Sequence, residues 1–391
     1  MIYDTVVVGA GPAGALLAYD LARRGLEVLL IEKARLPRYK ACGGGLTLKT
    51  IQSLPFDVSP ALEQEADGGI VCYGGQPLLR TPLRRYAWLA MRDRFDHFLV
   101  QQAVAAGAYL ADGLPVIAVE EGRDHVVVRT RDGDFAARFV AGADGVNSVV
   151  ARAAGLLSDR EVGVAIEAEL AVPDGALEAQ GSYATFDFGA LPGGYGWIFP
   201  KRDHLSVGVF RAQPGQSRGL KHCLEAFIAS HAVLHESRRL SLQGHFIPLG
   251  GKKEPLHKGR ALLLGDAANL ADPWLGEGVY YAVVSARIAA EVVWQVLSGA
   301  AADLSAYTAR IHSQIIRQLG HARRFASLVY RFPRLGSQLL SRSPLMQSAV
   351  FGVIRGDITF RQLNRMLTFH LPRILLQAVS FNPPPADTSL S

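Results

Sequence analysis

The fold of this chain is decided by one stretch, Thr5-Val6-Val7-Val8-Gly9-Ala10-Gly11-Pro12-Ala13-Gly14. The apolar, β-branched run over residues 5–8 predicts a buried strand, and the glycines follow it at once. Residues 15–24 have helical composition, Gly25 ends the helix, and residues 27–31 predict a second strand that leads to Glu32. Because strand, glycine turn, helix, strand and acid form the layout of a dinucleotide-binding unit, we expect a bound dinucleotide.

Each glycine of the stretch has its own task. Gly9 permits the tight turn out of the strand, Gly11 leaves room for a pyrophosphate beside the backbone, and Gly14 lets the helix pack close to the sheet. Pro12 and Ala13 are included in the predicted cofactor site, and the N-terminus of the helix that follows faces the phosphates with free N–H groups and a partial positive charge. A glycine turn that serves packing alone would explain neither this spacing nor the acid that follows.

Glu32 indicates which dinucleotide is bound. It lies 18 residues beyond Gly14, where a carboxylate accepts hydrogen bonds from a ribose. An acid at this place favours FAD or NAD over NADP. Lys33 follows it and is included in the predicted cofactor site.

Two later segments favour FAD over NAD. Residues 139–148 run from an apolar strand into Asp144-Gly145, and residues 261–268 run from another strand into Gly265-Asp266. An aspartate at such a turn can hold a ribityl hydroxyl while the N–H groups of the next helix approach phosphate or flavin oxygen. Taken singly, each segment is also compatible with an ordinary helix cap; together with the first, they predict FAD.

Composition limits the class of protein. The chain has 391 residues, of which 49% are hydrophobic and 19% charged, so it can bury a large core, and we expect two closely joined domains. We see no uncharged apolar stretch long enough to span a membrane and no leader before the first strand. Three cysteines, Cys42, Cys72 and Cys223, suggest neither a disulfide framework nor a zinc site, and the histidines suggest no metal. We expect a cytoplasmic protein.

The net charge of +6 is unevenly placed. From Arg317 to the end the chain carries ten arginines, no lysine and two acids, a net charge of +8. Arginines mixed with bulky apolar residues on helices fit peripheral attachment of residues 317–380 to an anionic membrane, and they fit equally a helical cap with solvated arginines. No motif for nucleic acid accompanies the charge.

The three cofactor segments resemble the FAD-binding domain of the flavoprotein hydroxylase superfamily. More narrowly, the chain is similar to the geranylgeranyl reductase family over most of residues 1–300. Three stretches carry this similarity: Pro37-Arg38-Tyr39-Lys40-Ala41-Cys42-Gly43-Gly44-Gly45-Leu46, Tyr195-Gly196-Trp197-Ile198-Phe199-Pro200-Lys201, and residues 265–278 with Asp272-Pro273-Trp274-Leu275-Gly276-Glu277-Gly278. Ala41 stands where the family usually has Pro, and Trp274-Leu275 replaces its usual Phe or Leu followed by Thr. These departures leave the exact substrate open.

The resemblance implies further site residues. Arg92, with Arg94 as the competing candidate, helps to bind FAD. The loop at Gly43, Gly44 and Gly45 lets the backbone approach a planar ring, with Cys42 at its edge either beside the flavin or as a small buried residue. The helix after Gly276 and Gly278 would stabilise negative charge on the reduced ring, with Glu277 as a helix-start acid.

Alternation over residues 195–201 predicts a strand with Tyr195, Trp197 and Phe199 on one face. We expect this face to form an aromatic wall for a long apolar substrate, or else part of a core. Cys42, Tyr195 and Trp197 are the predicted catalytic residues. Arg80, Arg84 and Arg85 are candidates for a polar head group, or solvated surface charges.

The predicted fold is α/β: a Rossmann-like FAD-binding domain with an inserted β-sheet substrate domain and a C-terminal helical region. The FAD-binding domain is expected over 1–155 and 255–300, with 70–90 contributing to the substrate domain. The substrate domain is expected over 160–250, the helical region over 301–380 and a disordered tail over 381–391.

The predicted function is an FAD-dependent reductase of isoprenoid double bonds, which uses hydride from reduced flavin N5 and NAD(P)H or a ferredoxin as electron donor. The substrate would be an isoprenoid or prenyl lipid. An FAD-dependent monooxygenase of an apolar substrate is the alternative enzyme class. A flavin-bound protein without turnover is the third.

Overall fold

The computed structural model describes residues 1–83, 85–156, 160–213 and 218–380. The predicted tail at 381–391 lies outside the described residues, as does Arg84.

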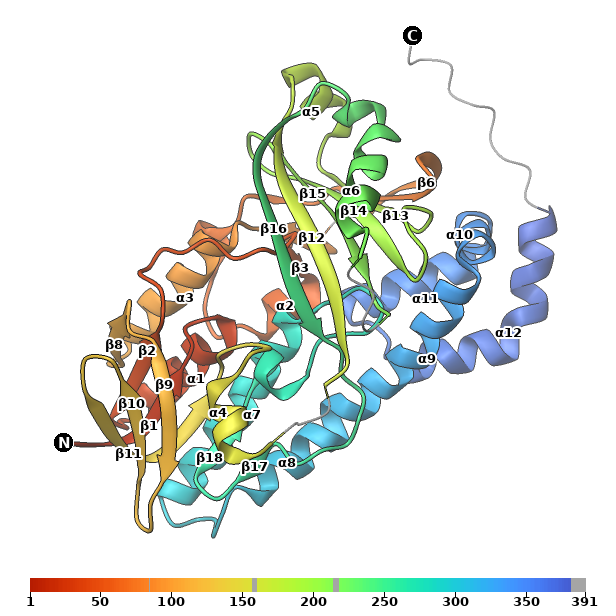
Figure 1. Ribbon diagram of the computed structural model, residues 1–391. Coiled ribbons are helices and arrows are strands. Elements are labelled where there is room, and N and C mark those ends of the chain that lie inside the picture. The colour runs from red at the N-terminus through yellow and green to blue at the C-terminus, as the bar shows by residue number, and fades with distance from the viewer. Residues whose placement is uncertain (84, 157–159, 214–217, 381–391) are drawn as a thin grey trace.

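The opening stretch lies in the middle of an eight-stranded sheet (Figure 1). Strand β1 (Ile2–Val8) pairs in parallel with β2 (Val28–Glu32) on one side and β11 (Asp134–Gly142) on the other. The rest of the sheet is β8 (Tyr109–Asp112), β18 (Ala261–Leu263), β17 (His257–Lys258), β9 (Val116–Glu121) and β10 (Val126–Thr130). Since β1 lies between the two parallel halves, the crevice beyond its carboxyl end is where such sheets bind ligands.

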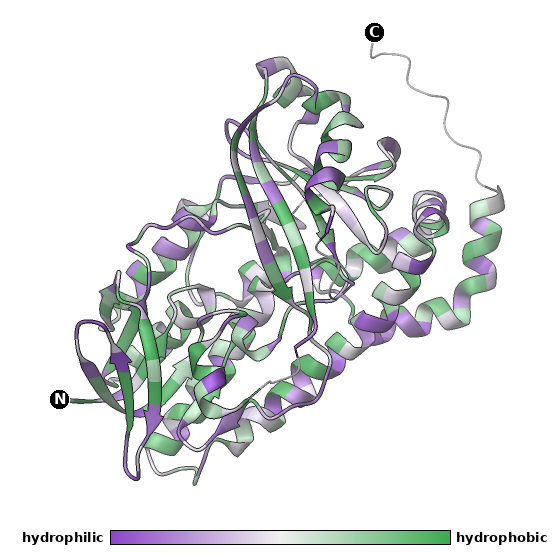
Figure 2. Ribbon diagram, viewed as in Figure 1, coloured by the Kyte–Doolittle hydropathy of each residue, from purple (hydrophilic) through white to green (hydrophobic). Residues whose placement is uncertain are grey.

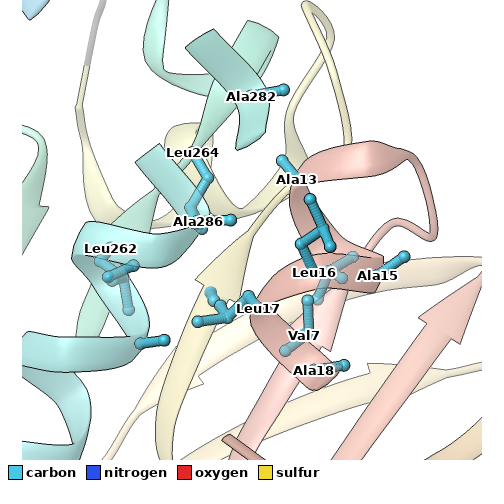
Figure 3. Packing of buried hydrophobic residues seen from close by; sticks show 14 of the residues in the cluster. Val7, Ala13, Ala15, Leu16, Leu17, Ala18, Leu262, Leu264, Ala282 and Ala286 are labelled. Carbon is cyan, nitrogen blue, oxygen red and sulfur yellow. The ribbon is translucent and has the colours of Figure 1, made fainter. Parts of the chain in front are cut away.

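Helix α1 (Pro12–Ala22) is buried between this sheet and α7 (Val279–Leu297). Figure 3 shows Ala13, Leu16 and Leu17 of α1 facing Leu264 and Ala282. A Cβ on Gly14 would lie 1.9 Å from the carbonyl oxygen of Gly9, so only glycine allows this approach. Helix α4 (Val149–Ala154) packs on the same sheet, and α3 (Arg92–Ala105) packs against α1.

A second, seven-stranded sheet stands above the first (Figure 1). Its order is β16 (Arg238–Pro248), β12 (Val162–Ala171), β15 (Leu205–Arg211), β14 (Gly194–Pro200), β13 (Tyr183–Asp187), β5 (Gly68–Tyr73) and β6 (Gln76–Pro82). One face carries aromatic side chains, and the other packs against α6 (Leu220–Ala229) through residues such as Phe227. Because successive side chains of β14 point to opposite faces of the sheet, they pack into two different hydrophobic cores.

Smaller elements join the sheets. A three-stranded sheet contains β3 (Gly45–Thr47), β7 (Ala87–Leu89) and β4 (Gln64–Glu65), and the short helices are α2 (Leu48–Ser53) and α5 (Asp174–Gln180).

The chain ends in helices along one side of both sheets (Figure 1). They are α8 (Ser305–Ile311), a π-helical turn (His312–Ile316), α9 (Arg317–Arg331), α10 (Pro333–Arg342), α11 (Pro344–Arg355) and α12 (Phe360–Ser380). Phe325, Phe351 and Phe360 are buried in the cluster that also holds the aromatic face of β14. Figure 2 shows hydrophilic and hydrophobic residues interspersed along these helices. Within the described ranges, no helix has the length and hydropathy to cross a bilayer.

The predicted fold class is confirmed. The domain limits stay a proposal: the first sheet takes its strands from residues 2–142 and 257–263, and the second from 68–82 and 162–248.

Candidate active site

A cavity of about 730 Å³ lies where the carboxyl end of β1 meets the aromatic face of the second sheet. Most of the residues predicted from sequence line it. They are Gly9, Gly11, Pro12, Ala13, Glu32, Lys33, Cys42, Gly43, Gly44, Gly45, Arg92, Asp144, Gly145, Tyr195, Trp197, Asp266, Gly276 and Gly278. Gly14 and Gly265 do not. Gly14 serves helix packing as predicted, and Gly265 adopts a positive φ of 52° while its N–H donates to Ser285.

The nucleotide end of the cavity has space beside its backbone. A Cβ on Gly11 would meet only one guanidinium nitrogen of Arg38, at 3.9 Å, and one on Gly145 would meet nothing within 4 Å. Gly9 has a φ of 99°, and a Cβ there would lie 2.4 Å from the carbonyl oxygen of Ala143. The backbone can thus turn sharply and still leave room for a pyrophosphate.

Glu32 lies at this end, buried, with partners that hold its carboxylate. It accepts hydrogen bonds from the N–H of Ala10 (2.9 Å) and of Ala34 (3.2 Å), and Arg38 Nε lies 3.3 Å from Oε2. Arg38 also bonds Asp96 at 3.1 Å. Glu32 lines the cavity, where a further lone pair of its carboxylate would accept a ribose hydroxyl.

Arg92 and Arg94, the two competing arginines, lie in different places. Arg92 is buried, donates twice to Asp96 (2.7 and 2.8 Å) and lines the cavity. Burial opposes its charge, but the carboxylate of Asp96 raises the pKa of Arg92 above its ordinary value. Arg94 points outward and pairs with Glu63 at 2.8 Å. Because Arg92 lines the cavity and Arg94 does not, the structure favours Arg92 as the arginine that would help to bind FAD.

Asp144 has one carboxylate oxygen with a partner and one without. Oδ2 accepts the N–H of Val149 at 2.6 Å, whereas Oδ1 is buried and makes no hydrogen bond. Burial raises the pKa of Asp144. A buried acceptor without a donor is costly, and a ribityl hydroxyl would supply the donor. The residues present therefore fit FAD.

Asp266 lies 3.8 Å from Lys40 Nζ, and both residues line the cavity. His245, on β16, presents a buried Nε2 without a partner to the same cavity. Burial and the nearby Lys40 lower the pKa of His245 to about 4, so its imidazole is neutral at ordinary pH. Sequence reasoning missed His245 because the strand that carries it matches no cofactor motif.

The glycine loop packs against the aromatic face. A Cβ on Gly43 would lie 2.8 Å from the indole nitrogen of Trp197, and one on Gly44, whose φ is 70°, would lie 1.9 Å from the carbonyl oxygen of Ala90. Lys201 is buried and donates to the carbonyls of Gly43 (2.8 Å) and Ala90 (3.0 Å). Cys42, half-buried, accepts the N–H of Gly44 at 3.4 Å.

Aromatic side chains line the other end of the cavity. Tyr195 contacts the rings of Trp197 and Phe210, at centroid distances of 6.2 and 5.7 Å. The remaining lining of this end comes from Tyr86, Ala165, Ala184, Phe186, Phe199, Ile247 and Trp274, and from Val353, Ile354 and Phe360 of α11 and α12. We name this set, with Tyr195, Trp197 and Phe210, the apolar arm. The contribution of the C-terminal helices was not foreseen, because their residues show only apolar and basic character in the sequence.

The tyrosine hydroxyl in the apolar arm already has an acceptor. Tyr195 donates to the carbonyl oxygen of Leu275 at 2.7 Å, and burial raises its pKa above the ordinary value. Both effects hold the proton on the phenol.

Glu277 does more than begin a helix. Its carboxylate pairs with Lys49 Nζ at 2.7 Å and accepts from Thr47 at 2.7 Å, and all three residues line the cavity. Burial alone would lower the pKa of Lys49, but Glu277 raises it above the ordinary value. The pair was missed because Lys49 is far from Glu277 in sequence.

The remaining candidates lie away from the cavity. Arg80 stacks over the ring of Tyr183 at 4.1 Å, and the backbone N–H of Arg85 bonds Glu65. Arg84 is not among the described residues. Cys72 is buried in β5, and burial, with Asp187, raises its pKa to about 12. The part of the chain that the structure describes contains no cluster of three His, Cys, Asp or Glu side chains suited to a metal.

Comparisons with known proteins bear on the cofactor and the family. Residues 2–174 match the family model described as an FAD binding domain. An uncharacterized protein of Methanosarcina barkeri is 33% identical, over 94% of this chain and 91% of its own. Digeranylgeranylglycerophospholipid reductase 1 of Methanopyrus kandleri is 30% identical, over 75% of this chain and 80% of its own. A solved geranylgeranyl bacteriochlorophyll reductase-like protein of Thermoplasma acidophilum has a similar fold, with a TM-score of 0.78, 22% identity and coverage of 96% and 98%.

Proposed function

The chain belongs to the geranylgeranyl reductase family of FAD-dependent oxidoreductases, and from this premise we propose that it saturates carbon–carbon double bonds of an isoprenoid chain. The observation that carries the proposal is the continuity of one cavity: FAD-binding segments line one end, and the apolar arm lines the other. When bound and reduced, FAD supplies the hydride, from N5 of its ring system.

The protein contributes position and a dry environment. An isolated alkene is a poor electrophile, so the double bond must be held in place while water is kept out. Tyr195 and Trp197 are each less than a tenth exposed and form the wall against which we place the prenyl chain. Because the phenol proton of Tyr195 is held by Leu275, we assign Tyr195 a positioning role in this wall rather than proton donation.

Cys42 stays a candidate for contact with substrate. It lies at the cavity edge of the glycine loop, where Gly43 meets Trp197. We propose that its thiol limits how far a prenyl chain advances toward the ring. Cys42→Ser should change the preference among double bonds more than it changes FAD binding.

The substrate class we propose is a prenyl lipid. The apolar arm consists of apolar and aromatic side chains, so we propose that it takes the hydrocarbon part of the substrate; the cations that line the same cavity, such as Lys40, Lys49 and Arg92, are not part of this set. The electron donor is proposed to be NAD(P)H or a ferredoxin. Steady-state assays with each donor separate the two.

The test uses protein loaded with FAD and photoreduced without oxygen. Addition of a digeranylgeranylglycerophospholipid, or of geranylgeranyl diphosphate, should restore the absorbance of oxidised flavin, and mass spectrometry should find the saturated product. A hydroxylated product that forms only with O2 and NADPH would instead establish the monooxygenase alternative, which shares the same FAD segments. No reoxidation by any prenyl compound would favour a flavin-bound protein without turnover.

We further propose that α9 to α12 contact an anionic membrane, from which the substrate would enter. Large apolar side chains are exposed there: Leu328, Phe332, Leu335, Phe369, Leu371 and Leu375. Of the ten arginines from Arg317 onward, Arg323 and Arg355 alone have an acidic partner within 4 Å in the described ranges. Uncompensated cations beside exposed apolar groups are the combination that binds anionic lipid.

A further inference from the structure

Asp272 is a buried carboxyl at the wall of the cavity. It is 2% exposed and directly precedes Pro273 in the loop between the last strand of the first sheet and α7. Its Oδ1 accepts the N–H of Trp274 at 2.6 Å, which fixes the side chain against the loop. The residue thus stands beside both Trp274 of the apolar arm and the glycines that lead into α7.

Asp272 has no cation within 4 Å among the described residues, a property it shares at this cavity with Asp144, which belongs to a cofactor segment, and with Glu167, which accepts from the Tyr39 hydroxyl at 2.6 Å. Glu32 has Arg38, Asp266 has Lys40 and Glu277 has Lys49 within 4 Å, whereas no such partner is found for Asp272 in the described residues. Burial raises the pKa of Asp272 to about 7, although the Trp274 N–H and Lys49 act to lower it. A large part of Asp272 therefore carries a proton near neutral pH.

The reaction proposed above needs a proton donor beside the apolar arm, and three other groups that line the cavity are poorly suited. Tyr195 donates its hydroxyl to Leu275, and Cys42 lies at the glycine loop with its sulfur accepting the N–H of Gly44. Glu277 is engaged by Lys49 Nζ at 2.7 Å and by the Thr47 hydroxyl at 2.7 Å. A carboxylic acid kept neutral by burial is a known arrangement for an enzymatic acid.

We propose that Asp272 is the proton donor for saturation of the alkene. The carboxyl gives its proton to one carbon as the π bond breaks, and the other carbon receives the hydride that the reduced cofactor supplies. The pair of electrons in the O–H bond stays on Asp272, and the carboxylate regains a proton from solvent before the next turnover. This proposal rests on the proposed function.

The test is Asp272→Asn in the FAD-loaded protein. The amide oxygen still accepts the Trp274 N–H, so the loop is retained while the proton is removed. With photoreduced protein and a digeranylgeranylglycerophospholipid, we expect the rate constant of flavin reoxidation to fall about 100-fold, whereas reoxidation by O2 and the affinity for FAD stay unchanged. The wild-type rate should decline above about pH 7, and this decline should be absent in the variant.

Asp187→Asn is the matched control. Asp187 is also buried and also accepts backbone N–H groups, from Gly74 and Gly75 at 2.8 and 2.6 Å, but it does not line the cavity. It should react with the prenyl lipid as the wild type does. Equal prenyl reduction by wild type and Asp272→Asn would overturn the proposal.

A second readout needs no turnover. Because folding raises the pKa of Asp272, the folded state binds a proton that the unfolded state has lost between about pH 4 and pH 7, so stability falls as pH rises through this window. The melting temperature should thus fall less from about pH 5 to about pH 8 in Asp272→Asn than in wild type or Asp187→Asn. The titratable groups that face Asp272 are Lys49, Tyr195, Glu277, Tyr281 and Tyr330.

The rate of flavin reoxidation and the pH dependence of melting together distinguish failure of the proposed function from failure of the donor role alone. A wild type that reduces no prenyl probe overturns the proposed function and the donor role with it. A wild type that reduces the probe while Asp272→Asn shows an unchanged pH dependence of melting, or unchanged reoxidation, overturns the donor role alone.

Discussion

At the nucleotide turn, the space beside the backbone decides which residue each position can hold. Gly14 leaves no space for a methyl group, because a Cβ would lie 1.9 Å from the carbonyl oxygen of Gly9. This requirement is local, and it could be predicted from the glycine spacing. Lys201 is the contrary case: its two acceptors, Gly43 and Ala90, belong to distant segments, so its role depends on the tertiary fold.

Gly14→Ala should destabilise the FAD-binding core. The clash is with backbone, which cannot move aside cheaply, so we expect a loss of about 3 kcal/mol in free energy of unfolding and weaker FAD binding. Urea unfolding with and without FAD measures both. Gly175→Ala is the control: a Cβ there would meet nothing within 4 Å on α5, and the change should be neutral or slightly stabilising. Equal stability of the two variants would contradict the packing argument.

Lys201→Met should loosen the glycine loop. The apolar side chain preserves bulk but leaves the carbonyls of Gly43 and Ala90 without their donor, at a cost of about 1–3 kcal/mol. Burial lowers the pKa of Lys201, so part of the lost bonding is offset by removal of a poorly solvated ammonium. Melting temperature and FAD fluorescence titration measure the result. Arg202→Met, at an exposed neighbour, should change neither; an effect as large as that of Lys201→Met would argue against the loop contact.

At the scale of elements, β1, β11 and β18 could be predicted from sequence because each is an apolar run followed by a glycine turn. Strands β8, β9, β10 and β17 and helix α3 are marked by no such motif and were not predicted. Strand β1 contains the run at 5–8, whereas helix α1, expected over 15–24, begins at Pro12 and ends at Ala22. The placement of α11 and α12 against the apolar arm could not be predicted, since Phe360 of α12 contacts Trp274 and Phe325, and α11 packs on α12, through contacts that no local pattern encodes. Residues assigned to a membrane face or a cap, such as Ile354, instead line the cavity.

Val353→Phe on α11 should shorten the apolar arm. Val353 is 3% exposed and lines the cavity, so a larger side chain has little room except toward the cavity. We expect the ratio of kcat/KM for geranylgeranyl over geranyl compounds to fall about tenfold, since a lost contact of this size is worth about 1–3 kcal/mol. Reoxidation kinetics with both chain lengths measure it. Val350→Phe, buried on the same helix but absent from the cavity lining, is the control; the same change of ratio there would point to general disruption of α11.

In the whole molecule, the positive charge of the C-terminal helices and one end of the cavity lie in the same region. The ten arginines are spread over α9 to α12, and two of these helices, α11 and α12, line the apolar arm. Under the membrane proposal, one region would hold the prenyl chain and face the lipid surface that delivers it. His321, on α9, shows the effect of these positive charges. Burial lowers the pKa of its imidazole, and Arg324, Arg361 and Arg317 lower that pKa further. Composition predicted this excess of charge, but which apolar residues stay exposed was decided by packing.

Arg361→Gln combined with Arg365→Gln should weaken binding to vesicles that contain phosphatidylserine. Both arginines are exposed on α12, and each cation near an anionic surface contributes about 1 kcal/mol, so we expect about a tenfold or greater loss of affinity in sedimentation assays. Added salt should reduce wild-type binding more than binding of the variant, because the arginine contribution is the one that is screened. Phe369→Ser should weaken binding without altering this salt dependence, whereas Ile117→Ser, which is also exposed but lies on β9, should have no effect. If all variants bind as the wild type does, the arginines are solvated charges of a helical cap.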